Sequence, residues 1–149
     1  MAATVPNCRA YDPAYACELA VIVEHGLRRM VEEERDEFFY ITVMNETYAQ
    51  PSLPAGAEEG ILKGLYRLGG HGDPEAAIRA RLLGSGTILP QVIGAAEILA
   101  ERYGIASDVY SATSYPELAR EAWAVERRNR LGAADTPESS HVERLLAGP

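Results

Sequence analysis

The sequence predicts an α/β protein in which two partial units of parallel sheet are joined by a Gly/Pro-rich linker. Two observations favour this class. A short aromatic and β-branched run, residues 38–44, lies between two segments of helical periodicity. The second half then repeats a strand–helix–strand–helix order with short turns. Short, continuously apolar strands are typical of parallel sheets between helix layers, and alternating strands and helices predict parallel pairing.

The first helix is predicted over residues 13–30. Asp12 suits the N-cap, and Pro13 suits the first helical position, where its missing N–H costs nothing. Apolar residues then recur at steps of three and four, at Ala16, Leu19, Ala20, Val23, Leu27 and Met30. The acidic run 32–37 follows, and we interpret it as a solvated connection.

Residues 38–44 predict a strand that is buried on both faces. The loop 45–56 leaves the carboxyl end of this strand, which is the edge where open α/β sheets bind ligands. Asn45, Glu46 and Tyr48 are therefore the candidates for a substrate or active-site loop. The alternative is that Asn45 and Glu46 only satisfy backbone groups of the loop.

Helical spacing returns over residues 57–68, where Gly60 and Gly64 permit close approach of a neighbouring segment. The run Gly69-Gly70-His71-Gly72-Asp73-Pro74 cannot easily continue a helix or enter a central strand. We place the main boundary of the chain there. The predicted organisation is a first unit over 1–70, a linker over 71–76 and a second unit over 77–149.

The second unit begins with a strand over 78–83 and a turn over 84–87. A helix over 88–103, ended by Gly104, leads into a strand over 105–112. Ser114 is the predicted cap of the next helix, and a short helix over 141–146 ends the pattern. Two parallel strands have no closed core, so we expect their partners either from the first unit or from outside this sequence.

Composition excludes several classes of function. The net charge of −8 argues against general nucleic-acid binding, which needs a basic face. No apolar run reaches the roughly 18–20 residues of a membrane span, and residues 1–6 lack the features of a secretory signal, so we expect a cytoplasmic protein. Cys8, Cys17 and the scattered histidines have no metal-ligand spacing.

Three motifs carry potential chemistry. Gly84-Ser85-Gly86 lies between a strand and a helix, where it would suit a phosphate, or a turn that only needs small residues. Glu24 and His25 are weak candidates for acid–base catalysis, because histidine titrates near neutral pH but has no identifiable partner here. Ser111, Thr113 and Ser114 lack the companions of a catalytic serine.

Ordered blocks along residues 4–137 resemble the homodimeric-type pyruvate dehydrogenase E1 component of bacteria. The blocks in the first half include Val5-Pro6-Asn7-Cys8, Tyr11-Asp12-Pro13-Ala14-Tyr15, Gly26-Leu27-Arg28-Arg29-Met30, Met44-Asn45-Glu46 and Gly56-Ala57-Glu58-Glu59-Gly60-Ile61. Those in the second half include Leu82-Leu83-Gly84-Ser85-Gly86, Ala95-Ala96-Glu97-Ile98-Leu99 and Ser107-Asp108-Val109-Tyr110-Ser111. The resemblance implies a transketolase-like fold, with residues 1–70 as the end of the pyrimidine-binding middle domain and 77–149 as the start of the C-terminal domain.

The resemblance also implies what the full-length family does. Such an enzyme binds thiamine diphosphate and Mg²⁺, decarboxylates pyruvate and passes the acetyl group to the lipoyl group of the E2 acetyltransferase, and it works as a homodimer. This sequence contains no Gly-Asp-Gly followed by the metal-binding Asn, nor the segment with the glutamate that activates the cofactor. Where the family often carries an active-site His or Gln, this chain has Glu24, with His25 one step along.

Three hypotheses follow. The first is a fragment of an E1 polypeptide that is inactive alone and binds no cofactor by itself. The second is a non-catalytic interaction module that docks on a full-length E1 or E2 subunit. The third is an independent small α/β enzyme that uses the loop Asn45–Tyr48.

Overall fold

A computed structural model describes residues 4–132 and 136–148. Met1, where the first predicted unit begins, and Pro149, where the second one ends, lie outside the described residues. The helices are α1 (Ala16–Leu27), α2 (Glu58–Lys63), α3 (Leu89–Tyr103), α4 (Tyr115–Arg130) and α5 (His141–Leu145). The strands are β1 (Cys8–Tyr11), β2 (Phe38–Ile41), β3 (Tyr66–His71), β4 (Arg79–Gly84) and β5 (Ala106–Ser111). This mixture of helices with parallel strands confirms the predicted α/β class.

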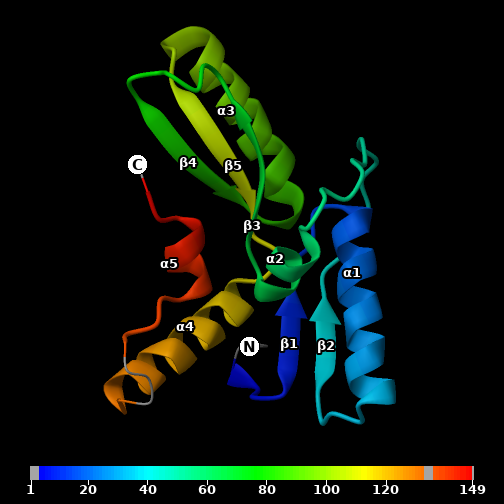
Figure 1. The fold of residues 1–149 in the computed structure, drawn as a ribbon. Coiled ribbons are helices and arrows are strands. Elements are labelled where there is room, and N and C mark those ends of the chain that lie inside the picture. Colours follow the sequence, from blue (N-terminus) through cyan, green and yellow to red (C-terminus); the bar gives the residue numbers. More distant parts are fainter. Residues whose placement is uncertain (1–3, 133–135, 149) are drawn as a thin grey trace.

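The strands form two sheets (Figure 1). β1 and β2 pair in parallel, from Cys8 opposite Phe38 to Tyr11 opposite Ile41. The second sheet has the order β3-β5-β4, in which β4 and β5 are parallel, as predicted, and β3 is antiparallel to β5. β3 comes from the first predicted unit, so the missing partner of the β4–β5 pair lies within this sequence. The division into units at the 71–76 linker stays a prediction.

The first helix begins later than predicted. Its N-cap is Tyr15, not Asp12, and Glu18 completes a capping box there. Asp12 instead accepts a hydrogen bond from the side chain of Thr42, so the predicted cap is wrong because tertiary partners take up that carboxylate. α1 continues into a π-helical turn over Arg28–Glu32. Such turns are uncommon and are found mostly as single-turn bulges within helices.

The predicted helix 57–68 is wrong over its second half. α2 ends at Lys63 because Gly64 adopts a left-handed conformation with φ +98°. Leu65 is fully buried, and the chain then enters β3 at Tyr66. The expected close approach at Gly64 is confirmed, because a Cβ there would lie 2.3 Å from the carbonyl oxygen of Ser114.

The predicted burial of the strand over 38–44 is also wrong. β2 spans four residues, with Phe38 47% and Tyr40 55% exposed, while Phe39 and Ile41 are partly buried against the core beneath α1. Val43, beyond the strand, is 70% exposed. Only one face of β2 is covered, and its outer edge pairs with no other described strand.

The second half agrees closely with the sequence pattern. α3 starts with Pro90 in its first turn and ends at Gly104, which has a left-handed φ of +63°. β5 is the most buried strand, with Val109 and Tyr110 almost fully enclosed. The hydroxyl of Ser114 accepts the backbone N–H of Glu117, so the predicted cap of α4 is confirmed. α3 contacts the β3-β5-β4 sheet, while α4 contacts β1 and α5 (Figure 1).

Candidate functional site

The carboxyl ends of three strands meet between the two sheets. Asp12 directly follows β1 and accepts hydrogen bonds from Thr42, just beyond β2, and from Ser85, just beyond β4, at 2.9 Å for the serine. The backbone N–H of Gly86 donates to the Asp12 carbonyl oxygen. We call Asp12, Thr42, Ser85 and Gly86 the strand-end cluster. It lies where open α/β sheets usually place ligands.

The predicted loop begins beside this cluster. The hydroxyl of Tyr48 donates to the carbonyl oxygen of Ala14, and its ring packs edge-on against Tyr15 with centroids 6.1 Å apart. Glu46 and Tyr48 line a pocket of about 160 Å³ beside the start of α1. Asn45 is exposed and does not line that pocket. The structure therefore brings two of the three predicted loop residues to one hollow, together with Val43 and Met44.

A buried carboxylate lies beneath the same region. Glu18 is fully buried, and its Oε2 accepts the backbone N–H groups of Ala14 and Tyr15 at 2.6 and 3.1 Å. Its Oε1 accepts the hydroxyls of Tyr66 at 2.7 Å and Ser111 at 2.6 Å. Burial and the neighbouring Glu18 carboxylate both raise the pKa of Tyr66 well above its usual range. Four donors on one carboxylate make this a satisfied structural joint between α1, β3 and β5.

Glu24 and His25 lie away from the loop. His25 is roughly 14 Å along the axis of α1 from Ala16, at the 1.5 Å rise of a helical residue. Its Nδ1 accepts a hydrogen bond from Arg28 at 3.2 Å. Burial, followed by the nearby charges of Arg28 and Arg29, lowers the pKa of His25. Glu24 is exposed, so the structure does not assemble these two residues with Glu46 and Tyr48.

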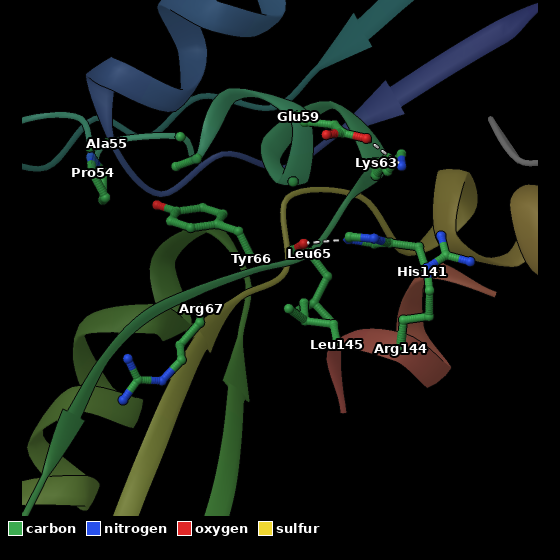
Figure 2. Close-up of a pocket in the computed structure, with 13 residues that line it drawn as sticks. Pro54, Ala55, Glu59, Lys63, Leu65, Tyr66, Arg67, His141, Arg144 and Leu145 are labelled. Atoms are coloured by element: carbon green, nitrogen blue, oxygen red, sulfur yellow. Dashed lines mark hydrogen bonds and ion pairs between the residues drawn. The ribbon is translucent and has the colours of Figure 1, made fainter. Parts of the chain in front are cut away.

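A larger hollow of about 410 Å³ lies between α2, β3 and α5 (Figure 2). Its lining includes the basic side chains of Lys63, Arg67, His141 and Arg144 and the apolar side chains of Leu65, Pro54 and Leu145. The ring of His141 is held by a 2.8 Å hydrogen bond between its Nε2 and the carbonyl oxygen of Leu65. We call this hollow the α2–α5 pocket.

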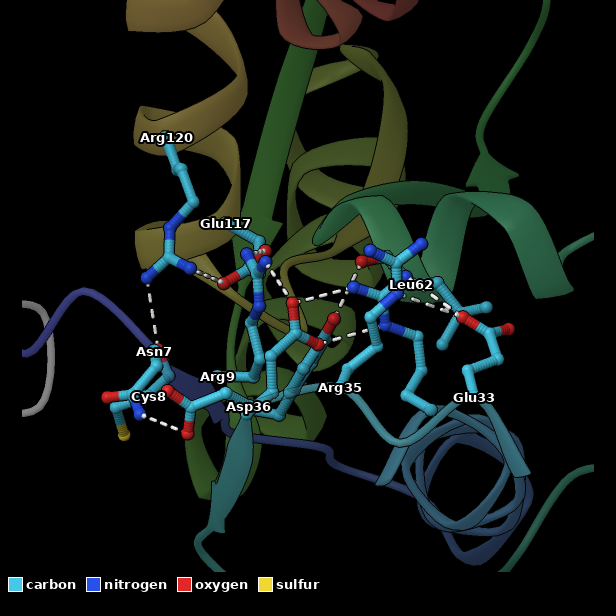
Figure 3. A network of polar contacts seen from close by, with 12 residues as sticks. Asn7, Cys8, Arg9, Glu33, Arg35, Asp36, Leu62, Glu117 and Arg120 are labelled. Atoms are coloured by element: carbon cyan, nitrogen blue, oxygen red, sulfur yellow. Dashed lines mark hydrogen bonds and ion pairs between the residues drawn. The ribbon is translucent and has the colours of Figure 1, made fainter. Parts of the chain in front are cut away.

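An ion-pair network joins β1, the π-helical turn after α1, the segment just before β2 and α4 (Figure 3). Glu37 accepts from Arg29 through both carboxylate oxygens, at 2.6 and 2.9 Å, and from Arg9 at 2.7 Å. Arg9 also donates to Glu117 at 2.9 Å. The hydrogen bonds from Arg29, and then those from Arg9, lower the pKa of Glu37 to about 2. His25 and Tyr11 line the adjoining pocket of about 220 Å³.

These arrangements offer little for a bound diphosphate and Mg²⁺. Within residues 4–132 and 136–148, no three His, Cys, Asp or Glu side chains gather as a metal site would require. The Gly84–Gly86 turn lies against the carboxylate of Asp12, since a Cβ on Gly86 would be 2.6 Å from both of its oxygens. A carboxylate at that distance repels a phosphate, so the turn fits the packing interpretation of this motif better than the phosphate interpretation.

The sequence interpretation missed the residues whose hydrogen bonds link elements far apart in the chain. Glu18 stands one helical turn before the buried Ile22, so a charged residue on the buried face of the predicted helix was a usable signal. Its partners Tyr66 and Ser111 lie 48 and 93 residues away. Arg9 and Glu117 are 108 residues apart. No local pattern predicts such pairs.

No helix of the described ranges has the length and apolar composition to cross a membrane. A family model described as the middle domain of the pyruvate dehydrogenase E1 component matches residues 1–51. Proteins named pyruvate dehydrogenase E1 component are similar over almost the whole chain. The protein of Pseudomonas aeruginosa is 55% identical over 148 residues, which cover 99% of this chain and 17% of that relative.

Two further relatives agree. The Escherichia coli K12 protein is 49% identical over 148 residues, covering 96% of this chain and 16% of the relative. The Cupriavidus necator protein is 47% identical over 144 residues, covering 97% and 16%. The chain thus spans about one sixth of the length of these relatives.

Proposed function

Since this chain is related over almost its entire length to the pyruvate dehydrogenase E1 component, we propose that it supplies a scaffold segment of such an enzyme and is inactive alone. The observation that carries this proposal is the 55% identity that extends over 99% of the chain but only 17% of the Pseudomonas aeruginosa relative. The activity of that enzyme would be the oxidative decarboxylation of pyruvate, in the cytoplasm, with acetyl transfer to lipoyl-E2.

The described side chains support a scaffold role. The carboxylates of Glu18 and Glu37 are taken up by hydrogen bonds that hold separate elements together. The pocket beside the predicted loop, about 160 Å³, is smaller than the roughly 300 Å³ at which ligand pockets usually begin. Thiamine diphosphate and Mg²⁺ would be held by other parts of a full-length enzyme, with Glu46 and Tyr48 on a loop that borders the substrate space.

A chimera tests this role. The 148 residues of the Pseudomonas aeruginosa relative that align with this chain would be replaced by the chain itself. If the chain is an equivalent segment, the chimera keeps pyruvate-dependent activity within about tenfold of the parent, because more than half of the residues are already identical. A chimera that folds as a dimer and binds thiamine diphosphate, yet shows no activity, would contradict the proposal.

A second candidate function is a non-catalytic interaction module that docks on a full-length E1 or E2 subunit. The outward face of β2 favours it. Phe39 and Ile41 pack against the core cluster that includes Ile22 of α1, so Phe38 and Tyr40 lie on the opposite face, where they are 47% and 55% exposed beside the open edge of the strand. Exposed aromatic side chains and an unpaired strand edge are features of docking sites.

Co-purification separates the two candidates. The interaction module is expected to retain a full-length E1 or E2 subunit at micromolar concentration, and the double substitution Phe38→Ser, Tyr40→Ser is expected to abolish that retention. Tyr103→Ser is the matched control, since Tyr103 is 68% exposed on α3, away from this surface. Absence of retention by the unsubstituted chain would exclude the module and leave the scaffold segment.

A further inference from the structure

The α2–α5 pocket has the size of a ligand site. Its volume of about 410 Å³ falls within the roughly 300–1,000 Å³ typical of small-molecule pockets. Its walls come from the loop before α2, from α2 itself, from the start of β3 and from α5, which lies more than 70 residues further along the chain. The pocket therefore forms only when these distant segments pack together in the folded chain.

Positive charge gathers at this pocket although the protein as a whole carries −8. Three cationic side chains, Lys63, Arg67 and Arg144, line it together with a single carboxylate, Glu59. Figure 2 shows Lys63, His141 and Arg144 toward one side of the hollow and Pro54, Tyr66 and Arg67 toward the other. Lys63 and Arg144 therefore approach the hollow from the same side.

The ion pairs that Lys63 and Arg144 make within the protein are exposed or long. Lys63 pairs with Glu59 at 2.6 Å, but the two side chains are 37% and 77% exposed, so solvent screens the pair. Arg144 donates to the carbonyl oxygen of Ser139, and its nearest carboxylate, on Glu121, is 3.9 Å away. A guanidinium has five N–H donors, so Arg144 keeps donors for an incoming anion.

Arg67 and His141 are already held by hydrogen bonds within the protein. Arg67 is held by two hydrogen bonds to Asp108, at 2.7 and 2.9 Å. His141 donates from Nε2 to the Leu65 carbonyl oxygen, which fixes the start of α5 against β3. The anion would therefore interact chiefly with Lys63 and Arg144, while His141 keeps the two segments at the spacing that the pocket needs.

The floor of the pocket is apolar. Leu65 is fully buried and Tyr66 is 4% exposed, and the hydroxyl of Tyr66 is already bonded to Glu18. Pro54 and Leu145 complete this part of the lining. The partly exposed apolar side chains of the lining include Pro54 and Leu145, so a ligand that fills the hollow covers apolar surface as well as contacting Lys63 and Arg144. Inorganic phosphate alone would leave Pro54 and Leu145 in contact with water.

We propose that the α2–α5 pocket binds a small organic anion, whose phosphate or carboxylate group lies between Lys63 and Arg144 and whose apolar body covers Pro54 and Leu145. This proposal does not depend on the role proposed above.

Phenyl phosphate is a suitable probe, with benzyl alcohol as its neutral counterpart. The full chain, labelled with ¹⁵N, would be titrated with each compound at low ionic strength and followed by amide chemical shifts. We expect saturable shifts from phenyl phosphate in segments 54–67 and 141–146, weaker binding as salt is added, and no saturation with benzyl alcohol. No saturable shift in these segments up to 10 mM phenyl phosphate, or equal binding of benzyl alcohol, would overturn the proposal.

Two substitutions test whether Lys63 and Arg144 are the side chains that bind the anion. Lys63→Gln and Arg144→Gln are each expected to raise the Kd for phenyl phosphate about three- to tenfold, since each removes one charged contact to the anion. Both side chains are partly or largely exposed, so the fold should tolerate these changes. Arg130→Gln is the matched control, because Arg130 is 71% exposed on α4 and does not line the pocket. An equal effect of all three substitutions, or of none, would contradict the assignment.

Discussion

The carboxylate of Glu18 accepts a 2.7 Å hydrogen bond from the hydroxyl of Tyr66 at a point where both residues are buried. This contact joins α1 to β3, and the same oxygen also accepts the hydroxyl of Ser111 on β5. The described hydrogen-bond donors to Glu18 are two backbone N–H groups and two hydroxyls, so the stability of this side chain in the protein interior depends on the complete set of these donors.

Removing one donor tests that dependence. Tyr66→Phe is expected to lower the free energy of unfolding by about 1–3 kcal/mol, because it removes a hydrogen-bond donor from a buried polar group. Urea-induced unfolding followed by circular dichroism measures the change. Tyr103→Phe is the control, since Tyr103 is 68% exposed, and it should leave the midpoint unchanged. Equal stability of the two variants would show that the Glu18–Tyr66 contact contributes nothing.

The Glu37 network predicts a dependence of stability on acid. Because the folded-state pKa of Glu37 is lowered to about 2, its contribution is fully present above the unfolded pKa of about 4.3 and is lost as pH falls through the folded value. Glu37→Gln is therefore expected to destabilise the chain by about 1–3 kcal/mol at pH 7.

The same substitution should have a shrinking effect as pH falls from about 4.3 toward 2, where the native carboxyl also becomes protonated. Unfolding curves at pH 7, 4 and 3 measure this trend. Glu101→Gln, at an exposed position of α3, serves as the control and should have little effect at any of these pH values. A difference between Glu37→Gln and the parent that stays constant with pH would contradict the role of the carboxylate charge.

Two glycines give opposite predictions for the same substitution. Gly64 has φ +98°, and a Cβ there would lie 2.3 Å from the Ser114 carbonyl oxygen. Gly64→Ala is expected to cost at least about 1–3 kcal/mol, from backbone strain together with that clash. Gly94 lies inside α3 with nothing within 4 Å of an added Cβ. Gly94→Ala should stabilise the chain by about 0.5–1 kcal/mol, because alanine favours the helix.

Thermal or urea unfolding of both variants decides this prediction. Destabilisation by Gly94→Ala would mean that α3 is covered at that position in solution, for instance by association of two copies. An unchanged stability of Gly64→Ala would mean that the turn between α2 and β3 differs from the one described.

The parts of the fold that sequence predicts well are those with local signals. α3 carries Pro90 in its first turn and Gly104 at its end, so both of its ends were predicted nearly to the residue. The start of α4 was predicted from the Ser114 cap. The helix 57–68 failed because Leu65 and Leu68 fit a helical period, while the left-handed turn at Gly64 is decided by close packing against Ser114. β1 was missed because four residues form a strand only through pairing with β2.

The candidate site likewise has features that local sequence predicts and features that depend on tertiary packing. The loop after β2 was correctly placed at a strand end, because strand polarity follows from chain order. Asn45, Glu46 and Tyr48 were chosen from that position alone, and their functional role stays a prediction. The partners of Glu18, Glu37 and Asp12 come from elements far apart in the chain, so tertiary packing alone brings them together.

Calorimetric titration of the purified chain with thiamine diphosphate and Mg²⁺ tests the central claim most directly, once circular dichroism has shown that the chain is folded. The full-length Pseudomonas aeruginosa relative, titrated in parallel, supplies the reference signal. We predict a flat titration for the chain, because its described residues neither gather metal ligands nor leave the Gly84–Gly86 turn open to a phosphate. Tight, saturable binding by the folded chain alone would contradict the scaffold role and require a complete cofactor site within these 149 residues.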